Sequence, residues 1–196
     1  MADGIMNKDQ LLSLTLRQLR QEASKLSVPL YSRKTKAVLV DLILKYQEKS
    51  ELEEQAEKSG FSLIELDGNI AVIGNGAGLV MSTFDMLADN GGKPAAFLDV
   101  GGGATTESVY KALELISKMD KVKAILVNLY GGIVKTTTVA SAFIQAYDNS
   151  IIDLPVFARL MGAESDKAKE MLADTKTKMF DSVEAAINSV VLEVNK

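Results

Sequence analysis

Short apolar runs alternate with helical patterns along residues 61–196, and this alternation constrains the fold more than any other feature. The apolar runs cover residues 70–73, 96–100, 124–129 and 156–160, with a weaker fifth run at Met179-Phe180. The helical patterns cover residues 79–90, 106–119, 134–148, 167–174 and 183–194. Runs this apolar are typical of strands covered on both faces. The repeated order predicts an α/β fold: a doubly wound, mainly parallel, flavodoxin-like sheet with helices on both faces.

Residues 1–46 form a separate segment, predicted to be a small helical module in which two short helices flank an extended loop. Thr15 or Ser13 could cap the first helix, and Pro29 marks its end. The apolar face of the first helix carries Leu16, Leu19 and Ala23. The apolar stripe of the second consists of Val38, Leu39, Leu42 and Ile43. Two helices enclose little apolar surface, so this module is expected to be marginally stable by itself.

A charged segment over residues 47–59 lacks apolar anchors and is predicted to be a linker, either a solvated helical extension or a flexible tether. It leads to the α/β domain, which covers residues 60–196. The charge of the chain changes near the same place. Nine of the 22 basic and five of the 26 acidic residues lie in residues 1–50, which leaves 13 basic and 21 acidic residues in 51–196. A positive first part and a negative second part suggest two modules with different partners.

The sequence contains no histidine and no cysteine, which excludes several kinds of chemistry on this chain. Imidazole general bases, a phosphohistidine and a thiol nucleophile are all ruled out, and no metal site is expected. A cysteine-free composition fits a reducing compartment, so the expected location is the cytoplasm or an organelle matrix or stroma. The first ten residues lack the order of a secretory signal, and no apolar stretch approaches the roughly 20 residues that span a bilayer. Membrane insertion is therefore not expected.

Glycine-rich loops follow the first three predicted strands, and each precedes a predicted helix. The loops are residues 74–79, 101–106 and 131–136. The carboxyl ends of parallel strands meet at one edge of the sheet, so the loops should converge there. Glycine lets the backbone approach a ligand closely, and a helix N-terminus offers free N–H groups with a partial positive charge. Together they predict a site for phosphate or carboxylate, although any one such loop is also ordinary turn punctuation.

Three charged residues lie close to these loops. Asp99, just before the triple glycine, could orient that loop by accepting backbone N–H bonds or act as a ligand, and the first role is the one expected. Arg159, at the end of the fourth strand, could pair with an anion or with Asp99. Lys135 lies in the first turn of a helix, where a cation opposes the helix dipole. Its position suggests a nearby acid, a bound anion or a partner surface.

Four motifs in the α/β part occur in the order and spacing of one known family. They are Asp-Gly-Asn-Ile at 67–70, Asn-Gly-Ala-Gly-Leu at 75–79, Phe-Leu-Asp-Val-Gly-Gly-Gly-Ala-Thr at 97–105 and Val-Asn-Leu-Tyr-Gly-Gly-Ile-Val at 127–134. Over roughly residues 61–196 the sequence resembles the C-terminal, CoA-ligase-type domain of the β subunit of succinyl-CoA synthetase and related acid–CoA ligases. Each motif alone is weak, but the joint pattern is highly specific.

The resemblance implies a mechanism in which ATP phosphorylates a histidine of the α subunit. The phosphohistidine moves between an ATP-grasp site and the site where succinyl phosphate and then succinyl-CoA form. Helix N-termini of both subunits hold the phosphate, and the β-subunit helix would start at residues 131–134. Asn75 and the backbone of residues 132–134 match family positions that bind the carboxylic acid.

The expected site is a substrate and phosphate site without a catalytic side chain. Its expected residues are Asn75, Gly76, Gly101, Gly102, Gly103, Thr105, Gly131, Gly132, Ile133 and Val134. No cofactor is expected to be bound by this chain alone. The expected ligand is a phosphate or carboxylate, such as succinate or a CoA-linked acid, at an interface between subunits.

The chain departs from the family pattern in three places. Residues 1–59 stand where the ATP-grasp domain, with its nucleotide site and magnesium ligands, is expected. After Gly-Gly-Ile-Val the family usually continues with a basic residue, a cysteine and an acid, whereas this chain has Lys135-Thr136-Thr137. Around the fourth strand the family usually reads Arg-Leu-Glu-Gly, followed by Asn or Thr, and here Met161 replaces the acid and Ala163 follows the glycine. The phosphate-holding loop is thus kept while its surroundings are altered.

The N-terminal module has a weaker resemblance of its own. Leu-Thr-Leu-Arg-Gln-Leu-Arg at 14–20, followed by Ser-Arg-Lys-Thr-Lys-Ala-Val-Leu at 32–39, resembles a SAP or Rho-N-terminal helix–loop–helix module. Such modules often bind nucleic acid. The residues that could contact phosphates are Arg17, Arg20, Arg33, Lys34 and Lys36. The same residues could instead belong to a protein-docking surface, and the sequence leaves both interpretations open.

Three functions follow from these observations. The first is a non-catalytic binding or assembly module, which the N-terminal module tethers to a larger complex. The second is a subunit of a split ADP-forming acid–CoA ligase, which supplies the phosphate-holding helix and the acid-binding loops to an α-subunit-like partner. The third is a nucleic-acid-binding protein that acts through its basic N-terminal module. In each case the single chain is expected to be inactive in acid–CoA ligation, because none of its side chains can carry the phosphoryl group as imidazole does.

Overall fold

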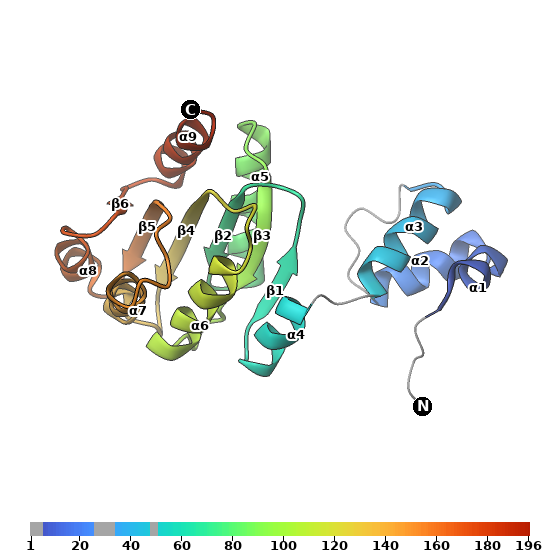
Figure 1. Ribbon diagram of the computed structural model, residues 1–196, viewed down its shortest axis with the longest axis horizontal. Helices are drawn as coiled ribbons and strands as arrows, with labels where there is room; N and C mark the ends of the chain where they lie inside the picture. The colour runs from blue at the N-terminus through green and yellow to red at the C-terminus, as the bar shows by residue number, and fades with distance from the viewer. Residues whose placement is uncertain (1–5, 26–33, 48–50) are drawn as a thin grey trace. The chain divides into compact units, whose positions relative to one another are not determined.

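A computed structural model describes residues 6–25, 34–47 and 51–196 of the chain (Figure 1). The chain divides into two compact units, residues 1–50 and residues 51–196. Each unit has an apolar core of its own. No helix within the described ranges is long and apolar enough to cross a membrane.

The first unit contains helices α1 (Lys8–Ser13), α2 (Leu16–Lys25) and α3 (Lys36–Gln47). Helix α1 was not expected from the sequence, and it begins with a capping box in which Asn7 and Gln10 bond each other's backbone N–H groups. Thr15 caps α2, as expected, and accepts a hydrogen bond from the Gln18 N–H at 3.3 Å. Pro29 lies outside the described residues.

A small core holds the three helices together. Its fully buried members are Leu11, Leu19, Ala23, Leu39, Val40 and Ile43. Leu16 and Val38 were expected on the apolar faces, but they are 37% and 42% exposed. Helix α1 explains part of this difference, because its Leu11 fills the core together with residues from α2 and α3.

The second unit is built on a six-stranded sheet with the order β1-β3-β2-β4-β5-β6. Its strands are β1 (Ser62–Glu65), β2 (Ile70–Gly74), β3 (Pro94–Asp99), β4 (Ala124–Gly131), β5 (Val156–Gly162) and β6 (Thr177–Met179). Strand β1 pairs antiparallel with β3, and all other pairs are parallel. The five parallel strands have the expected flavodoxin-like order, and β1 is an addition that the sequence pattern did not reveal.

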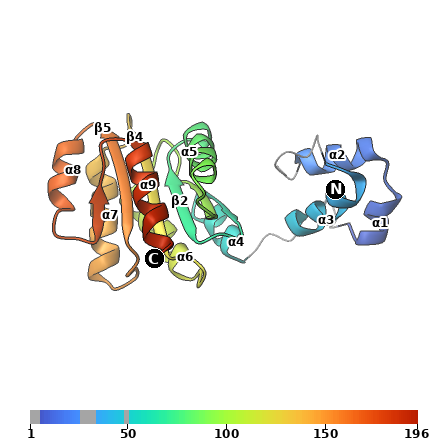
Figure 2. The same ribbon diagram turned by 90° about the horizontal axis from the view of Figure 1, so that it is seen from above.

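Helices cover both faces of this sheet (Figures 1 and 2). They are α4 (Glu51–Lys58), α5 (Ala77–Asp89), α6 (Thr106–Ser117), α7 (Thr136–Asp148), α8 (Ser165–Met171) and α9 (Val183–Val194). Residues of α4, α6, α7 and α8 pack into the core on one face, and residues of α5 and α9 into the core on the other. The predicted α/β fold with helices on both sides is confirmed.

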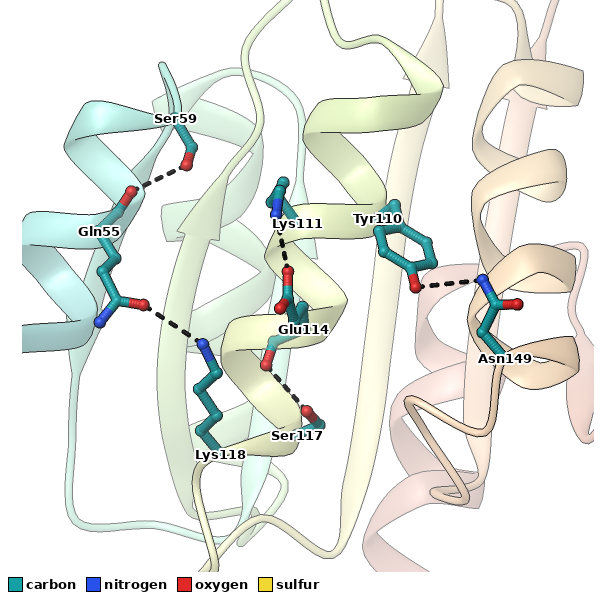
Figure 3. Close-up of polar contacts among 8 residues, drawn as sticks. All are labelled: Gln55, Ser59, Tyr110, Lys111, Glu114, Ser117, Lys118 and Asn149. Atoms are coloured by element: carbon teal, nitrogen blue, oxygen red, sulfur yellow. Dashed lines mark hydrogen bonds and ion pairs between the residues drawn. The ribbon is translucent and has the colours of Figure 1, made fainter.

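Helix α4 lies within the segment that was expected to be a linker. Ala56 is fully buried and Leu52 packs against the main core, one helical turn earlier. The Glu65 N–H donates to Glu53, which ties α4 to β1. The Lys118 ammonium donates to Gln55 at 3.3 Å, which ties α4 to the residue after α6 (Figure 3). The second unit therefore begins at Glu51 rather than at residue 60.

Candidate functional site at the carboxyl edge of the sheet

The three glycine-rich loops meet at the carboxyl edge of the parallel sheet. The register pairs Gly74 with both Asp99 and Asn128, so β2, β3 and β4 end at the same level. Strand β2 lies between the other two, and the loop that follows it is therefore next to both neighbouring loops. The sequence predicted this convergence, and side-chain contacts now show how the loops are joined.

Asp99 joins the first loop to the second. Its carboxylate oxygen accepts the Gly76 N–H at 2.7 Å and the Gly101 N–H at 2.9 Å. Both glycines have positive φ angles, 101° and 71°, a conformation that residues with a Cβ rarely adopt. Asp99 thus has the loop-orienting role expected from its position.

Asn75 joins the first loop to the third. Its Nδ2 donates to the Tyr130 carbonyl at 2.8 Å, and its Oδ1 accepts the Tyr130 N–H at 3.0 Å. The side-chain amide therefore forms a two-bond clamp on the backbone at the end of β4. Asn75 was expected to bind an acid substrate, and in this structure its first role is to hold the third loop in place.

Residues 131–135, called here the α7 loop, lead from β4 into α7. The backbone amides of Ile133, Val134 and Lys135 make no hydrogen bond to any part of the chain that the structure describes. Gly132 differs, because its N–H donates to the Tyr130 carbonyl at 3.1 Å. Lys135 is the N-cap residue of α7, so these three amides lie directly before the helix and are free to donate to a phosphate or carboxylate.

The turn after β5 packs tightly against the α7 loop. The Ala163 N–H donates to the Gly131 carbonyl at 2.9 Å, and Thr136 donates to the Ala163 carbonyl through its N–H and, at 2.8 Å, its hydroxyl. Gly162 has a φ of 104°, and a Cβ there would lie 2.1 Å from the Gly131 carbonyl oxygen. The two strand ends approach so closely that only glycine fits at residue 162.

An acid approaches the start of α7 from this turn. Glu164 binds the Lys135 ammonium at 2.7 Å and accepts the Thr137 hydroxyl at 2.6 Å. The bond from Lys135, followed by that from Thr137, lowers the pKa of the Glu164 carboxyl, and Glu164 in turn raises the pKa of Lys135. The position of Lys135 suggested a nearby acid, and Glu164 is that acid. Sequence reasoning missed Glu164, although the pairing of Gly131 with Gly162 in neighbouring strands places the residues after them together.

Arg159 belongs to a partly buried polar chain and not to the loops. Its Nη1 donates to Asn128 at 3.2 Å, the Asn128 amide donates to the Thr83 hydroxyl at 2.8 Å, and Thr83 donates to the Leu79 carbonyl. The suggested pair with Asp99 is wrong. Strands β3 and β5 are separated by β2 and β4, so the two residues lie three strand spacings apart, about 14 Å.

The remaining predicted residues of the second loop lie at the same edge without joining the α7 loop. Thr105 caps α6, where its hydroxyl accepts the Ser108 N–H at 3.1 Å, so this side chain already has a structural use. Gly102 and Gly103 are exposed. Helices α6 and α7 are linked instead by Thr106 of α6, whose hydroxyl donates to the Thr138 carbonyl of α7 at 3.2 Å.

Large exposed apolar side chains lie in the α7 loop and at the ends of the two strands next to it. Ile133 is 91% exposed, Tyr130 58% and Met161 38%, and these three residues are called here the apolar rim. Tyr130 and Met161 are register partners on β4 and β5. Exposed apolar groups around a polar centre are typical of a surface that another protein covers.

The basic residues of the first unit lie mostly on the surface. Arg17 and Arg20 line a shallow groove of about 350 Å³ on α2, together with Leu16, Gln21 and Ser24. Within the described ranges neither arginine forms an ion pair. Lys36 is exposed and Lys34 is half-buried, whereas Arg33 lies outside the described residues.

Comparison with known proteins matches the second unit. The CoA-ligase family profile matches residues 73–191. The β subunit of the ADP-forming succinate–CoA ligase of Deinococcus deserti is 44% identical over 147 residues, which are 74% of this chain and 38% of that protein. The GDP-forming β subunit of Thermus thermophilus is 44% identical over 136 residues, 69% of this chain and 36% of that protein. The chain thus spans well under half the length of these relatives.

Solved structures agree on the fold. ATP citrate lyase from Methanothrix soehngenii superposes with a TM-score of 0.62 and 16% identity, over 76% of this chain and 43% of that one. A dinucleotide-forming acetyl-coenzyme A synthetase from Ca. Korarchaeum cryptofilum superposes with a TM-score of 0.56 and 18% identity, over 83% of this chain and 42% of that one. At these identities the likeness concerns the fold alone.

Proposed function

The chain belongs to the CoA-ligase family, and from this premise we propose that it is a ligase-related binding and docking module that does not catalyse acid–CoA ligation by itself. The observation that carries the proposal is the α7 loop, where three backbone amides without acceptors lie beside the apolar rim. The amides suit a phosphate or carboxylate group. The rim suits a protein that closes over that group and excludes water.

The chemistry of the side chains supports a non-catalytic role. The resemblance implies a phosphohistidine as the carrier of the phosphoryl group, and the sequence has no histidine. The side chains of Lys135, the last residue of the α7 loop, and of Thr137 are both already bound to Glu164. A histidine carrier would therefore have to come from another chain, while this chain supplies backbone amides and a surface.

A working ligase subunit is the alternative. The bonds made by Asn75 and Asp99 keep the three loops joined, as a functional acid site would require. The relatives are β subunits by name, so a protein partner of the α-subunit type is the natural candidate. In that case succinate or a related acid, and later its CoA-linked form, would bind between the two chains, with no cofactor held by this chain alone.

The test combines capture and assay of the full chain. Tagged protein and an Ile133→Glu variant are recovered from the native source, and co-purifying proteins are identified by mass spectrometry. We expect a defined partner with the wild type and its loss with the variant. The purified chain alone should form no succinyl-CoA from succinate, CoA and ATP. Turnover by the single chain would refute the proposal, and turnover that requires an α-type partner would establish the alternative.

Nucleic-acid binding by the first unit is a second candidate, and one observation favours it. Arg17 and Arg20 line the groove on α2 without an ion pair among the described residues. Cations of this kind can contact phosphates, and such binding weakens steeply as salt rises. Single-stranded RNA and duplex DNA should bind the wild type at low salt and bind an Arg17→Gln, Arg20→Gln variant more weakly. Equal binding by both proteins would leave a protein-docking role for the groove.

A further inference from the structure

Glu164 lies where it can compete with a ligand of the α7 loop. We infer that its carboxylate acts as an internal competitor for anions and keeps the affinity of this loop for phosphate or carboxylate low. The inference rests on the proposed function, because it specifies how the same anion site is controlled. It makes Glu164 a residue that sets the affinity of the site, and the sequence motifs did not include it.

The backbone at Glu164 is held in an uncommon conformation. Its φ and ψ are 65° and 25°, in the left-handed region that residues other than glycine seldom occupy. The bonds of Ala163 to Gly131 and Thr136 fix the preceding residue. A strained residue persists only where its surroundings hold it, and such residues are common at functional sites. With the backbone in this conformation, the Glu164 carboxylate contacts Lys135 and Thr137 at the start of α7.

Both oxygens of Glu164 are used at the start of α7. One binds the Lys135 ammonium and the other accepts the Thr137 hydroxyl, at 2.7 Å and 2.6 Å. Helix α7 has 13 residues, and its N-terminal end carries a partial positive charge. Glu164 therefore places a negative charge at the N-terminal end of α7. It also binds the side-chain ammonium of Lys135, the last residue of the α7 loop.

Two effects then weaken the binding of an external anion. A phosphate on the amides of Ile133, Val134 and Lys135 would be repelled by the nearby carboxylate. The Lys135 ammonium, which could otherwise reach the phosphate, is bound to Glu164. The Glu164 side chain is 34% exposed, so the contact is open to solvent and can be exchanged without unfolding the site. Removal of this one charge should therefore strengthen binding.

The experiment is a titration of the full-length chain with inorganic phosphate, followed through the backbone amide signals of Ile133 and Val134 by NMR. Glu164→Gln keeps the shape of the side chain and removes its charge. We expect it to bind phosphate roughly three- to tenfold more tightly than the wild type. Glu164→Asn, which tolerates the left-handed conformation, should also bind more tightly. Adding Lys135→Gln to Glu164→Gln should return the affinity toward the wild-type value, because the released cation is lost.

The matched control is Asp166→Asn. Asp166 is exposed in the first turn of α8 and forms no ion pair among the described residues, but its replacement changes the net charge equally. Its phosphate affinity should stay within about twofold of the wild type. Equal affinities of Glu164→Gln and the wild type would overturn the inference and leave the anion site standing. If phosphate shifts neither amide in any variant, the anion site of the proposed function fails as well.

Discussion

The two units of the chain use the same local devices but differ in how their cores are built. Both cap their helices with short polar side chains, Asn7 in the first unit and Thr105 in the second. The described part of the first unit buries six apolar side chains in one cluster, whereas the sheet of the second has an apolar core on each face. The stability of the first unit should therefore depend on each of its few core contacts. The second unit has two cores to stabilise it, so the carboxyl edge of its sheet can stay exposed for binding.

The largest effect should come from removing one core side chain of the first unit. Leu39→Ala should cost roughly 2–5 kcal/mol, as other buried leucines do. A core this small rarely supplies more than that in total, so the first unit should unfold while the second stays folded. Hydrogen exchange measured by mass spectrometry would show loss of protection in α1, α2 and α3 and none in the second unit. Leu113→Ala, at a fully buried position of the second unit, should lower its melting temperature without unfolding it. Unfolding of both units together in the first variant would contradict their independence.

The next effect tests whether the open edge of the second unit is rigid. Gly162→Ala places a Cβ against the Gly131 carbonyl at a positive φ, and it should destabilise the second unit by roughly 2–4 kcal/mol. Gly78→Ala is the matched substitution, because no atom lies within 4 Å of a Cβ built there. It should be neutral or stabilise by up to about 1 kcal/mol. Urea unfolding followed by circular dichroism gives both values, and equal effects would show that the close approach is not needed.

A smaller effect should follow from opening the clamp between the first and third loops. Asn75→Asp keeps the size of the side chain but cannot donate to the Tyr130 carbonyl, so two acceptors face each other. The expected cost is about 1–3 kcal/mol, measured in the same urea experiment. Asn90→Asp, at the exposed end of α5, is a suitable control. If the two variants lose equal stability, the clamp contributes nothing specific.

The smallest effect concerns pH. Because the pKa of Glu164 is lowered in the folded chain, its ion pair stabilises the second unit above the ordinary pKa of 4.5 and is lost as pH falls through the lower folded value. Because the pKa of Lys135 is raised, the stabilisation that its ammonium contributes is lost only as pH rises beyond the ordinary pKa of 10.5. The Thr137 amide signal should therefore titrate with a midpoint below 4.5 in the wild type and not in Glu164→Gln. A wild-type midpoint at or above 4.5 would show that Lys135 and Thr137 do not hold this carboxylate.

The order of strands and helices could be predicted because β2 to β5 are almost wholly buried and leave clear apolar runs. Strand β1 could not, since it has four residues and only one of them is buried. A helical extension was one of the two forms expected for the segment of α4, but its packing onto the sheet was not expected, because among its described side chains only Leu52 and Ala56 join the apolar core. Short elements carry too few apolar positions for their period to be recognised.

The loops of the candidate site could be predicted from their glycines, but their connections could not. Asn75 and Tyr130 are 55 residues apart, and the partner of the asparagine is a backbone group that no sequence pattern marks. Glu164 follows a different strand from Lys135, and the two meet only because β4 and β5 are paired. Sequence reasoning thus located the edge of the sheet, and tertiary pairing decided which charges meet there.

The lengths of the outermost strands also affect how this protein behaves among copies of itself. Strands β1 and β6, at the two sides of the sheet, have four and three residues, the shortest in the fold. A short outer strand offers few free backbone groups to a neighbouring sheet, so fibre-like growth and precipitation through these sides are disfavoured. The apolar rim is then the surface of the second unit that favours association, so other molecules should bind at the carboxyl edge of the sheet.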